Sequence, residues 1–186
     1  MFRGSDEQMI TRRNLPRILI ADDHTLVAEA FKKFLDTDYG IVGIVGDGRS
    51  LVRVAAELRP DLIIIDVAMP ILNGIEGGQQ IKTLLPCIKL VYVTMNKDAD
   101  VAAEAFRRGA SGYLVKTRAA SELVIAVRHV LRGESYLSPT VAKGTVDFRV
   151  RRRIMLIDEG NKLSLRQREV LQFLAEGKNI RTWGAC

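Results

Sequence analysis

Cysteine and long apolar runs are scarce in this sequence. Its 186 residues include only Cys87 and Cys186, which are too few for the disulfide framework of a small secreted protein. No apolar run approaches the roughly 20 residues that a membrane-spanning helix needs, and residues 1–7 contain no apolar stretch of signal-peptide type. We therefore expect a protein of the reducing cytoplasm that has no membrane partner.

Positive charge is unevenly distributed. The formal net charge is +6, yet residues 1–137 carry 18 Lys and Arg against 17 Asp and Glu, while residues 138–186 carry 10 against 5. A run at Arg149, Arg151, Arg152 and Arg153 lies at the centre of this basic part. Such a run is typical of a solvated linker, and the alternative is a nucleic-acid-facing tail, because clustered cations release counterions from phosphate backbones.

Apolar runs alternate with helical periodicity along most of the chain. Short runs rich in Ile, Leu and Val predict buried strands at 17–21, 41–45, 62–65, 90–93 and 112–115. Helical spacing predicts helices at 25–35, 51–58, 74–85, 99–108 and 119–131. Five strands alternating with five helices indicate an α/β fold, in which helices cover both faces of a parallel sheet.

Polar residues follow four of the predicted strands, where an open α/β sheet gathers its functional groups. Asp22 and Asp23 follow the first strand, Asp66 the third, Thr94 the fourth and Lys116 the fifth. Each residue also has an ordinary explanation: an aspartate can cap a helix, a lysine can be solvated and a threonine can form a turn. Agreement at the ends of four independently predicted strands makes coincidence a poor explanation.

The charges of this set predict a metal-assisted phosphoryl acceptor. Three neighbouring carboxylates repel one another, and Mg²⁺ relieves such repulsion with oxygen ligands while leaving room for a phosphate oxygen. Asp66 is then the nucleophile that forms an aspartyl phosphate. Lys116 and the Thr94 hydroxyl are suited to binding the charged phosphoryl oxygens.

Residues 17–133 resemble the receiver domain of bacterial two-component response regulators. The motifs that carry the resemblance are Ile20-Ala21-Asp22-Asp23-His24, Ile65-Asp66-Val67-Ala68-Met69-Pro70 with Gly74, Val93-Thr94, and Gly112-Tyr113-Leu114-Val115-Lys116. The resemblance implies a flavodoxin-like (βα)5 fold with strand order 2-1-3-4-5. It also implies phosphorylation of Asp66 by a sensor histidine kinase.

The resemblance further implies roles for individual residues. Asp23, Asp66 and the Ala68 carbonyl would hold Mg²⁺ directly, and Asp22 would act through water. Tyr113 would be a switch aromatic that turns inward when Thr94 is drawn toward the phosphoryl group. One departure from the family pattern is Met95 after Thr94, where a small residue is common, and we expect its bulk to slow phosphoryl gain or loss. Thr117 replaces a common proline, which puts little in doubt.

The rest of the chain divides into three predicted parts. Residues 1–16 are polar and aperiodic and predict a disordered arm, and residues 134–162 predict a basic linker that is helical in part, around 141–157. Residues 163–186 resemble the start of a LuxR-type helix-turn-helix domain, the output module of the NarL subfamily. Ser164 with Gln167 predicts the helix start and Gly177 its end.

The ending after about Ile180 does not resemble the family continuation, so we expect a truncated DNA-binding domain. Such a chain would contact DNA without sequence specificity, because a recognition helix must enter the major groove. The apolar face of residues 165–174 would favour self-association. A homodimer through the first and fifth helices is also common in this subfamily.

The predicted function is therefore a transcription-controlling response regulator rather than a dedicated enzyme. The first alternative is a receiver-only module that acts through protein contacts or as a phosphate sink. The second is a flavodoxin-like flavin carrier, which the repulsion between Asp22-Asp23 and an FMN phosphate disfavours.

Overall fold

The computed structural model describes residues 15–144, and the structural statements that follow concern that part of the chain. The strands are β1 (Arg17–Ala21), β2 (Gly40–Val45), β3 (Leu62–Asp66), β4 (Lys89–Thr94), β5 (Gly112–Val115) and β6 (Tyr136–Leu137). The helices are α2 (Thr25–Leu35), α3 (Gly48–Leu58), α4 (Gly74–Leu84), α5 (Ala99–Arg107), α6 (Ala119–Leu131) and α7 (Pro139–Gly144), with a 3₁₀ turn, η1, at Lys116–Arg118.

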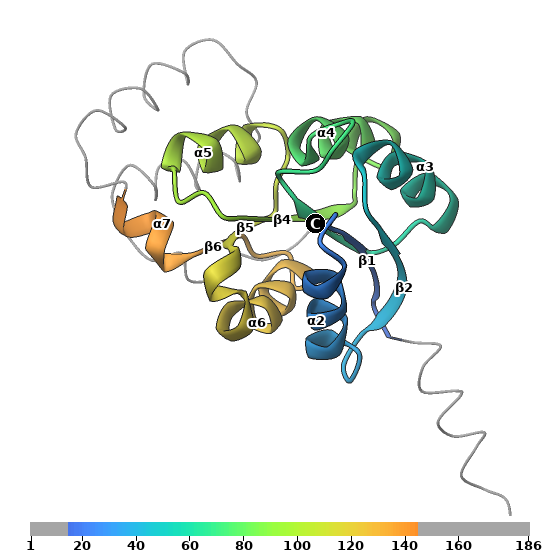
Figure 1. Ribbon diagram of the computed structural model, residues 1–186, viewed down its shortest axis with the longest axis horizontal. Helices are drawn as coiled ribbons and strands as arrows, with labels where there is room; N and C mark the ends of the chain where they lie inside the picture. Colours follow the sequence, from blue (N-terminus) through green and yellow to red (C-terminus); the bar gives the residue numbers. More distant parts are fainter. Residues whose placement is uncertain (1–14, 145–186) are drawn as a thin grey trace, which may run out of the picture.

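One parallel sheet organises these elements. Its strand order is β2-β1-β3-β4-β5-β6, and every pair of neighbouring strands is parallel. Helices α2 and α6 cover one face, while α3, α4 and α5 cover the other (Figure 1). The predicted flavodoxin-like α/β fold with order 2-1-3-4-5 is confirmed, and the structure adds β6 at the edge beside β5.

Apolar side chains on alternate strand positions build two separate cores. On β3, for example, Ile63 and Ile65 face α3 and α4, whereas Leu62 and Ile64 face the side of α2 and α6. Both faces of the central strands are thus buried, which explains why the strands appear in the sequence as continuous apolar runs without in-out alternation.

Strand β6 was not expected from the sequence. Helix α7 overlaps the start of the part of the linker, around 141–157, that was predicted to be helical, and it begins two residues earlier, at Pro139. Residues Tyr136 and Leu137 pair with Gly112 and Tyr113 of β5. A strand of two residues is too short to show a period, so it gave no sequence signal. The basic run at 149–153 and the predicted helix-turn-helix fragment at 163–186 lie outside the described residues.

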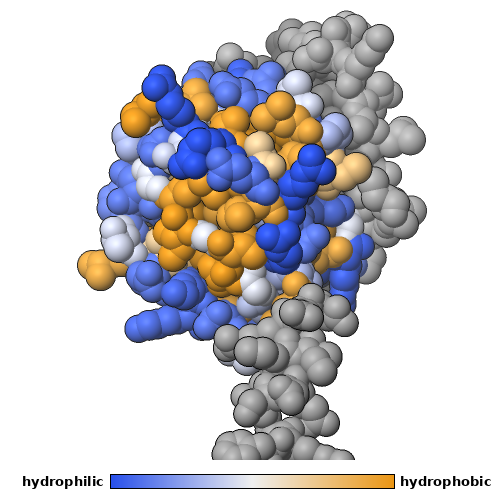
Figure 2. Space-filling model, turned by 90° about the vertical axis from the view of Figure 1, so that its right-hand side faces the viewer, coloured by the Kyte–Doolittle hydropathy of each residue, from blue (hydrophilic) through white to orange (hydrophobic). Residues whose placement is uncertain are grey.

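Strand β2 forms the other edge of the sheet and leaves apolar side chains partly exposed. Its residues are all half-buried or exposed, and Ile44 is among the exposed large apolar side chains. A view onto this side of the molecule shows apolar groups gathered at the centre and ringed by polar ones (Figure 2). Within residues 15–144, none of the helices has the length and apolar character needed to cross a membrane.

Two adjacent glycines in α4 differ sharply in their surroundings. A Cβ at Gly78 would overlap the hydroxyl of Tyr92 on β4, whereas a Cβ at Gly77 would make ordinary contacts at 3.7 Å with Leu51 and Leu72. The Tyr92 side chain is fully buried, and no described residue accepts or donates a hydrogen bond at its hydroxyl. Gly78 therefore has a packing reason to be a glycine, and Gly77 does not.

We expect Gly78→Ala to lower the free energy of unfolding by about 1–2 kcal/mol, because overpacking outweighs the gain in helix propensity. The matched control Gly77→Ala should raise that free energy by about 0.5–1 kcal/mol. Urea denaturation of both variants, alone and with Tyr92→Phe, measures the effect. Removing the hydroxyl should recover part of the loss at Gly78, and equal effects of the two alanines would contradict this explanation.

Candidate functional site

The carboxyl ends of four parallel strands bring the predicted site residues to one edge of the sheet. Asp66 and Thr94 are the last residues of β3 and β4, Asp22 and Asp23 follow β1, and Lys116 follows β5. Strand β3 lies between β1 and β4, so Asp66 is at the middle of the set. The sequence order of the five residues thus becomes a spatial cluster because all the strands run in the same direction.

Lys116 links two of the aspartates. Its Nζ lies 2.7 Å from Oδ2 of Asp66 and 2.9 Å from Oδ2 of Asp22. The lysine side chain is 9% exposed, and both carboxylates are buried. Burial alone would lower the pKa of Lys116, but hydrogen bonds and attraction from Asp66 and Asp22 outweigh burial and raise it. The explanation of Lys116 as a solvated surface lysine is therefore excluded.

Asp66 is held through both carboxylate oxygens. Oδ2 contacts Lys116, and Oδ1 accepts a hydrogen bond of 3.1 Å from the backbone N–H of Ala68. The backbone of Gly74, at the start of α4, approaches so closely that a Cβ there would overlap the carbonyl oxygen of Asp66. Only glycine permits this approach, which fixes the β3–α4 loop against the carboxylate.

Asp22 and Asp23 do not cap the helix that follows them, which was their alternative explanation. The N-cap position of α2 is His24, which makes no capping hydrogen bond through its side chain. Asp22 Oδ1 instead accepts a 2.9 Å hydrogen bond from the backbone N–H of His24. Asp22 is buried, whereas the Asp23 side chain is 32% exposed and is accessible from solvent.

His24 is a neighbour that the sequence reasoning did not place in the site. Its Nδ1 lies 2.8 Å from Asp23 Oδ1 and 3.4 Å from Asp22 Oδ1. The only signal for this contact was its position directly after the two aspartates, which does not by itself say where an exposed imidazole will lie. His24 therefore places an imidazole nitrogen at the solvent side of the carboxylate cluster.

The donor set suits a hard divalent cation. Ligand atoms of Asp22, Asp23, His24 and Asp66 all lie within 4.8 Å of one another. Three carboxylates face one lysine, so negative charge is in excess, and carboxylate oxygens are the ligands that Mg²⁺ prefers. The residues present therefore fit the predicted cation, while the part assigned to the Ala68 carbonyl stays a prediction.

Thr94 and Tyr113 are both buried on the β4–β5 side of the site. Thr94 Oγ1 accepts a 3.1 Å hydrogen bond from the N–H of Asn96, so the expected turn role exists in this structure. Burial, followed by the negative charge of Asp98, raises the pKa of Tyr113 to about 12, against a smaller lowering by Thr94. The Tyr113 hydroxyl lies near Thr94 but lacks a hydrogen bond of good geometry to any described residue.

Met95 stands exposed directly after Thr94. Its side chain is 66% exposed, in the loop between β4 and α5. The large apolar group therefore lies at the surface beside the buried threonine.

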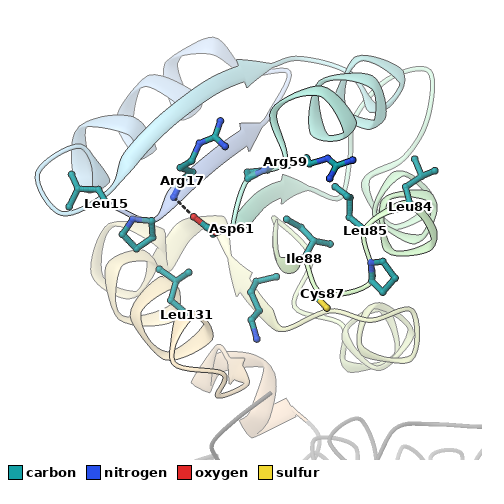
Figure 3. A pocket seen from close by; sticks show the side chains of 13 residues that line it. Leu15, Arg17, Arg59, Asp61, Leu84, Leu85, Cys87, Ile88 and Leu131 are labelled. Carbon is teal, nitrogen blue, oxygen red and sulfur yellow. Dashed lines mark hydrogen bonds between the residues drawn. The ribbon is translucent and has the colours of Figure 1, made fainter. Parts of the chain in front are cut away.

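A groove of about 850 Å³ lies at the opposite edge of the sheet. It is formed at the amino ends of β1, β3 and β4 (Figure 3), and its lining includes Arg17, Arg59, Asp61, Leu85 and Cys87. In Figure 3 Asp61 accepts a hydrogen bond from the backbone N–H of Arg17, at 2.7 Å. None of the five predicted site residues lines this groove, so it is separate from the site.

The sequence of this chain is similar to a known protein family and to several known proteins. The family model for the response regulator receiver domain matches residues 18–128. The transcriptional regulatory protein LiaR of Bacillus subtilis is 35% identical over 170 residues, which cover 90% of this chain and 80% of that protein. The response regulator protein VraR of Staphylococcus aureus is 33% identical over 163 residues, covering 87% of this chain and 76% of VraR.

Solved structures agree with the sequence relatives. A two-component response regulator of the LuxR family from Aurantimonas sp. SI85-9A1 superposes with a TM-score of 0.70 and 30% sequence identity. The match covers 74% of this chain and 99% of that one.

We expect Lys116→Met to destabilise the fold at neutral pH by about 3–5 kcal/mol, because two buried carboxylates lose their cation. Millimolar Mg²⁺ should restore more stability to this variant than to the wild type, since the metal then supplies the missing charge. Urea denaturation with Mg²⁺ and with EDTA measures both effects. The exposed Lys33→Met, on α2, is a control that should respond little, and an equal Mg²⁺ response in wild type and Lys116→Met would count against the proposed charge balance.

Proposed function

Because the chain belongs to the response regulator receiver family, we propose that it is a phosphorylation-controlled switch whose acceptor is Asp66. The phosphoryl group would come from a phosphohistidine on a partner sensor histidine kinase. The observation that supports this most directly is the contact of Lys116 with both Asp66 and Asp22 at the carboxyl edge of the sheet. The ends of β1, β4 and β5 place the other four predicted site residues at the same edge of the sheet as the Asp66 carboxylate at the end of β3.

The proposed step is a displacement at phosphorus. A carboxylate oxygen of Asp66 attacks the phosphorus atom and forms a P–O bond, while the P–N bond to the kinase imidazole breaks and its electron pair returns to the ring nitrogen. No oxidant or further reactant is needed. The later hydrolysis by water would return Asp66 to the carboxylate and release inorganic phosphate.

Asp22, Asp23 and Asp66 would hold Mg²⁺, together with the carbonyl of Ala68. Bound Mg²⁺ offsets the charge of the carboxylates and of the phosphoryl oxygens. By the resemblance to receiver domains, Asp23 would be a direct ligand and Asp22 would act through water.

The protein's own donors would stabilise the charge that develops on the phosphoryl group. Lys116 already lies against Asp66, so a small movement of its ammonium brings it to a phosphoryl oxygen. The Thr94 hydroxyl would donate to a second oxygen and leave its turn contact with Asn96 N–H. Tyr113 is buried beside Thr94, in the place where a switch aromatic would respond to that movement.

The proposed output is control of transcription. The relatives LiaR and VraR are named as a transcriptional regulatory protein and a response regulator. Control of transcription in this family acts through a LuxR-type DNA-binding domain, of which residues 163–186 are expected to be only the truncated start, preceded by the basic linker. The cytoplasmic location and a homodimer belong to the same proposal.

Intact-mass spectrometry tests the acceptor. With Mg²⁺ and acetyl phosphate the wild type should gain one phosphoryl group, and Asp66→Asn should gain none, because the amide is not a nucleophile. EDTA should prevent the gain, since the carboxylates then lack their cation. Asp61→Asn, at the opposite edge of the sheet, is the matched control, and equal labelling of Asp66→Asn and wild type would reject Asp66 as the acceptor.

The exposed methionine beside Thr94 gives a second test. We expect Met95→Ala to speed both phosphorylation by acetyl phosphate and loss of the phosphoryl group by about 3- to 10-fold, because a smaller side chain opens the approach to Asp66. Rates are followed by intact mass over time. Ile71→Ala changes another exposed apolar residue, in the loop before α4, and should change the rates less. Rates for Met95→Ala equal to those of the wild type would show that this side chain does not restrict access.

A further inference from the structure

Glu122 is a buried carboxylate outside the phosphoacceptor site. The residue lies in the first turn of α6 and is 5% exposed. Oε2 accepts a 2.7 Å hydrogen bond from the hydroxyl of Ser138, and Oε1 lies 3.2 Å from Nε of Arg118. A buried carboxylate is costly unless donors satisfy it, so these contacts fix where its partners must lie.

A third group, Tyr136 of β6, lies against the same carboxylate. Burial and then the charge of Glu122 raise the pKa of Tyr136 to about 12. Glu122 of helix α6 thus interacts with two residues of the following segment, Tyr136 and Ser138, which lie on either side of Leu137 in the sequence.

Ser138 connects three elements at once. Its side chain is bonded to Glu122 of α6, and its backbone N–H donates a 2.9 Å hydrogen bond to the carbonyl of Tyr113 in β5. Its own carbonyl accepts from the N–H groups of Val141 and Ala142 and so opens helix α7. The residue is fully buried. The hydroxyl bond to Glu122 fixes the residue whose backbone N–H and carbonyl bind β5 and α7. Loss of the hydroxyl would therefore loosen both β6 and α7.

The segment that Ser138 holds lies over the predicted switch aromatic. Leu137 pairs with Tyr113 across β5 and β6, and Leu137 and Val141 belong to the same apolar cluster as Tyr113 and Phe106 of α5. Helix α7 packs against α5, which follows the loop after Thr94 (Figure 1). A movement of Thr94, Tyr113 or α5 would consequently change the packing of β6 and α7.

We propose that Glu122 and Ser138 form a latch that fastens β6 and α7 over Tyr113, and that closure of this latch and phosphorylation of Asp66 favour each other. The second half rests on the proposed function. The closed latch keeps Tyr113 buried beside Thr94, the arrangement in which Thr94 is drawn toward a phosphoryl group. Energetic coupling between latch closure and phosphorylation is reciprocal. The Glu122 and Ser138 side chains, which stabilise the closed latch, should therefore also favour phosphorylation. Helix α7 is followed in the sequence by residues 145–186. Through the latch, phosphorylation of Asp66 would therefore change the stability of the helix that connects the receiver to the rest of the chain.

Hydrogen exchange on the full chain, read together with phosphoryl addition, tests the proposal. The variants are Ser138→Ala and the milder Glu122→Gln, which keeps the shape and one acceptor oxygen. Ser121→Ala is the matched control, because Ser121 is the neighbouring serine of α6, is exposed, and bonds only the Arg118 carbonyl among the described residues. Each protein is measured with Mg²⁺ alone and with Mg²⁺ plus acetyl phosphate.

In Mg²⁺ alone, Ser138→Ala should speed exchange of the amides in residues 136–142 by about tenfold, and Glu122→Gln by less. Exchange in β1 and β3 should stay as in the wild type, which shows that the fold is intact. Acetyl phosphate should slow exchange of residues 136–142 in the wild type by about fivefold, and Ser138→Ala should take up the phosphoryl group about fivefold more slowly. Ser121→Ala should behave as wild type in both measurements.

Three outcomes would overturn parts of this proposal in distinguishable ways. Unchanged exchange at residues 136–142 in both variants rejects the latch. Faster exchange with an unchanged rate of phosphorylation, and no response of the wild type to acetyl phosphate despite phosphoryl addition, rejects the coupling and leaves a structural contact. A wild type that gains no phosphoryl group rejects the proposed function and with it the coupling, while the exchange rates in Mg²⁺ alone still decide the latch.

Discussion

The excess of buried negative charge at one edge of the sheet is the constraint on which the rest of this structure depends. Asp22 and Asp66 are almost completely removed from water, and one ammonium group, that of Lys116, lies within 3 Å of both. Such a cluster is stable only if its cation is held in place, since an unpaired buried carboxylate is costly. Lys116 is held because β5 ends directly before it and the turn η1 begins at it.

The same constraint explains why the surrounding backbone is so tightly fixed. Gly74 lets α4 begin directly against the carbonyl of Asp66, and Gly48 lets α3 begin against the carbonyl of Leu72 in the same loop. A side chain at either position would push the β3–α4 loop away from the acceptor. Close backbone approach at these glycines thus keeps Asp66 where Lys116 and the N–H of Ala68 can bind its two oxygens.

Most of the fold could be predicted from the sequence because its signals are local. The buried strands are continuous apolar runs, and β1 and β5 have the predicted bounds, as does α2. The edge of the sheet that carries the site followed from the rule that parallel strands end together. The roles of Asp66, Lys116, Thr94 and Tyr113 and the Mg²⁺ ligand set stay predictions, because they depend on chemistry that geometry alone does not test.

What the sequence did not reveal depends on contacts between distant residues. Glycine is unfavourable within a helix, yet the close approach of the Tyr92 hydroxyl makes it necessary at position 78. The sequence near residue 78 does not indicate this contact. Strand β6 has two residues and no period, yet it is fixed by a backbone bond between Ser138 and Tyr113 and by the side chain of Glu122. Glu122 resembles an ordinary surface residue of an amphipathic helix until its neighbours are known.

The position of Tyr113 between two polar clusters connects these observations. On one side it lies near Thr94, at the carboxyl edge of β4, and on the other its backbone carbonyl receives the N–H of Ser138. Its hydroxyl is buried without a well-formed hydrogen bond to any described residue, which disfavours its present place relative to one that offers a partner. Leu137 and Val141 belong to the same buried apolar cluster as Tyr113, and this packing offsets the cost. The buried position of Tyr113 is therefore a balance between an unsatisfied hydroxyl and apolar packing, and a balance of that kind can be shifted by a modest change at either cluster.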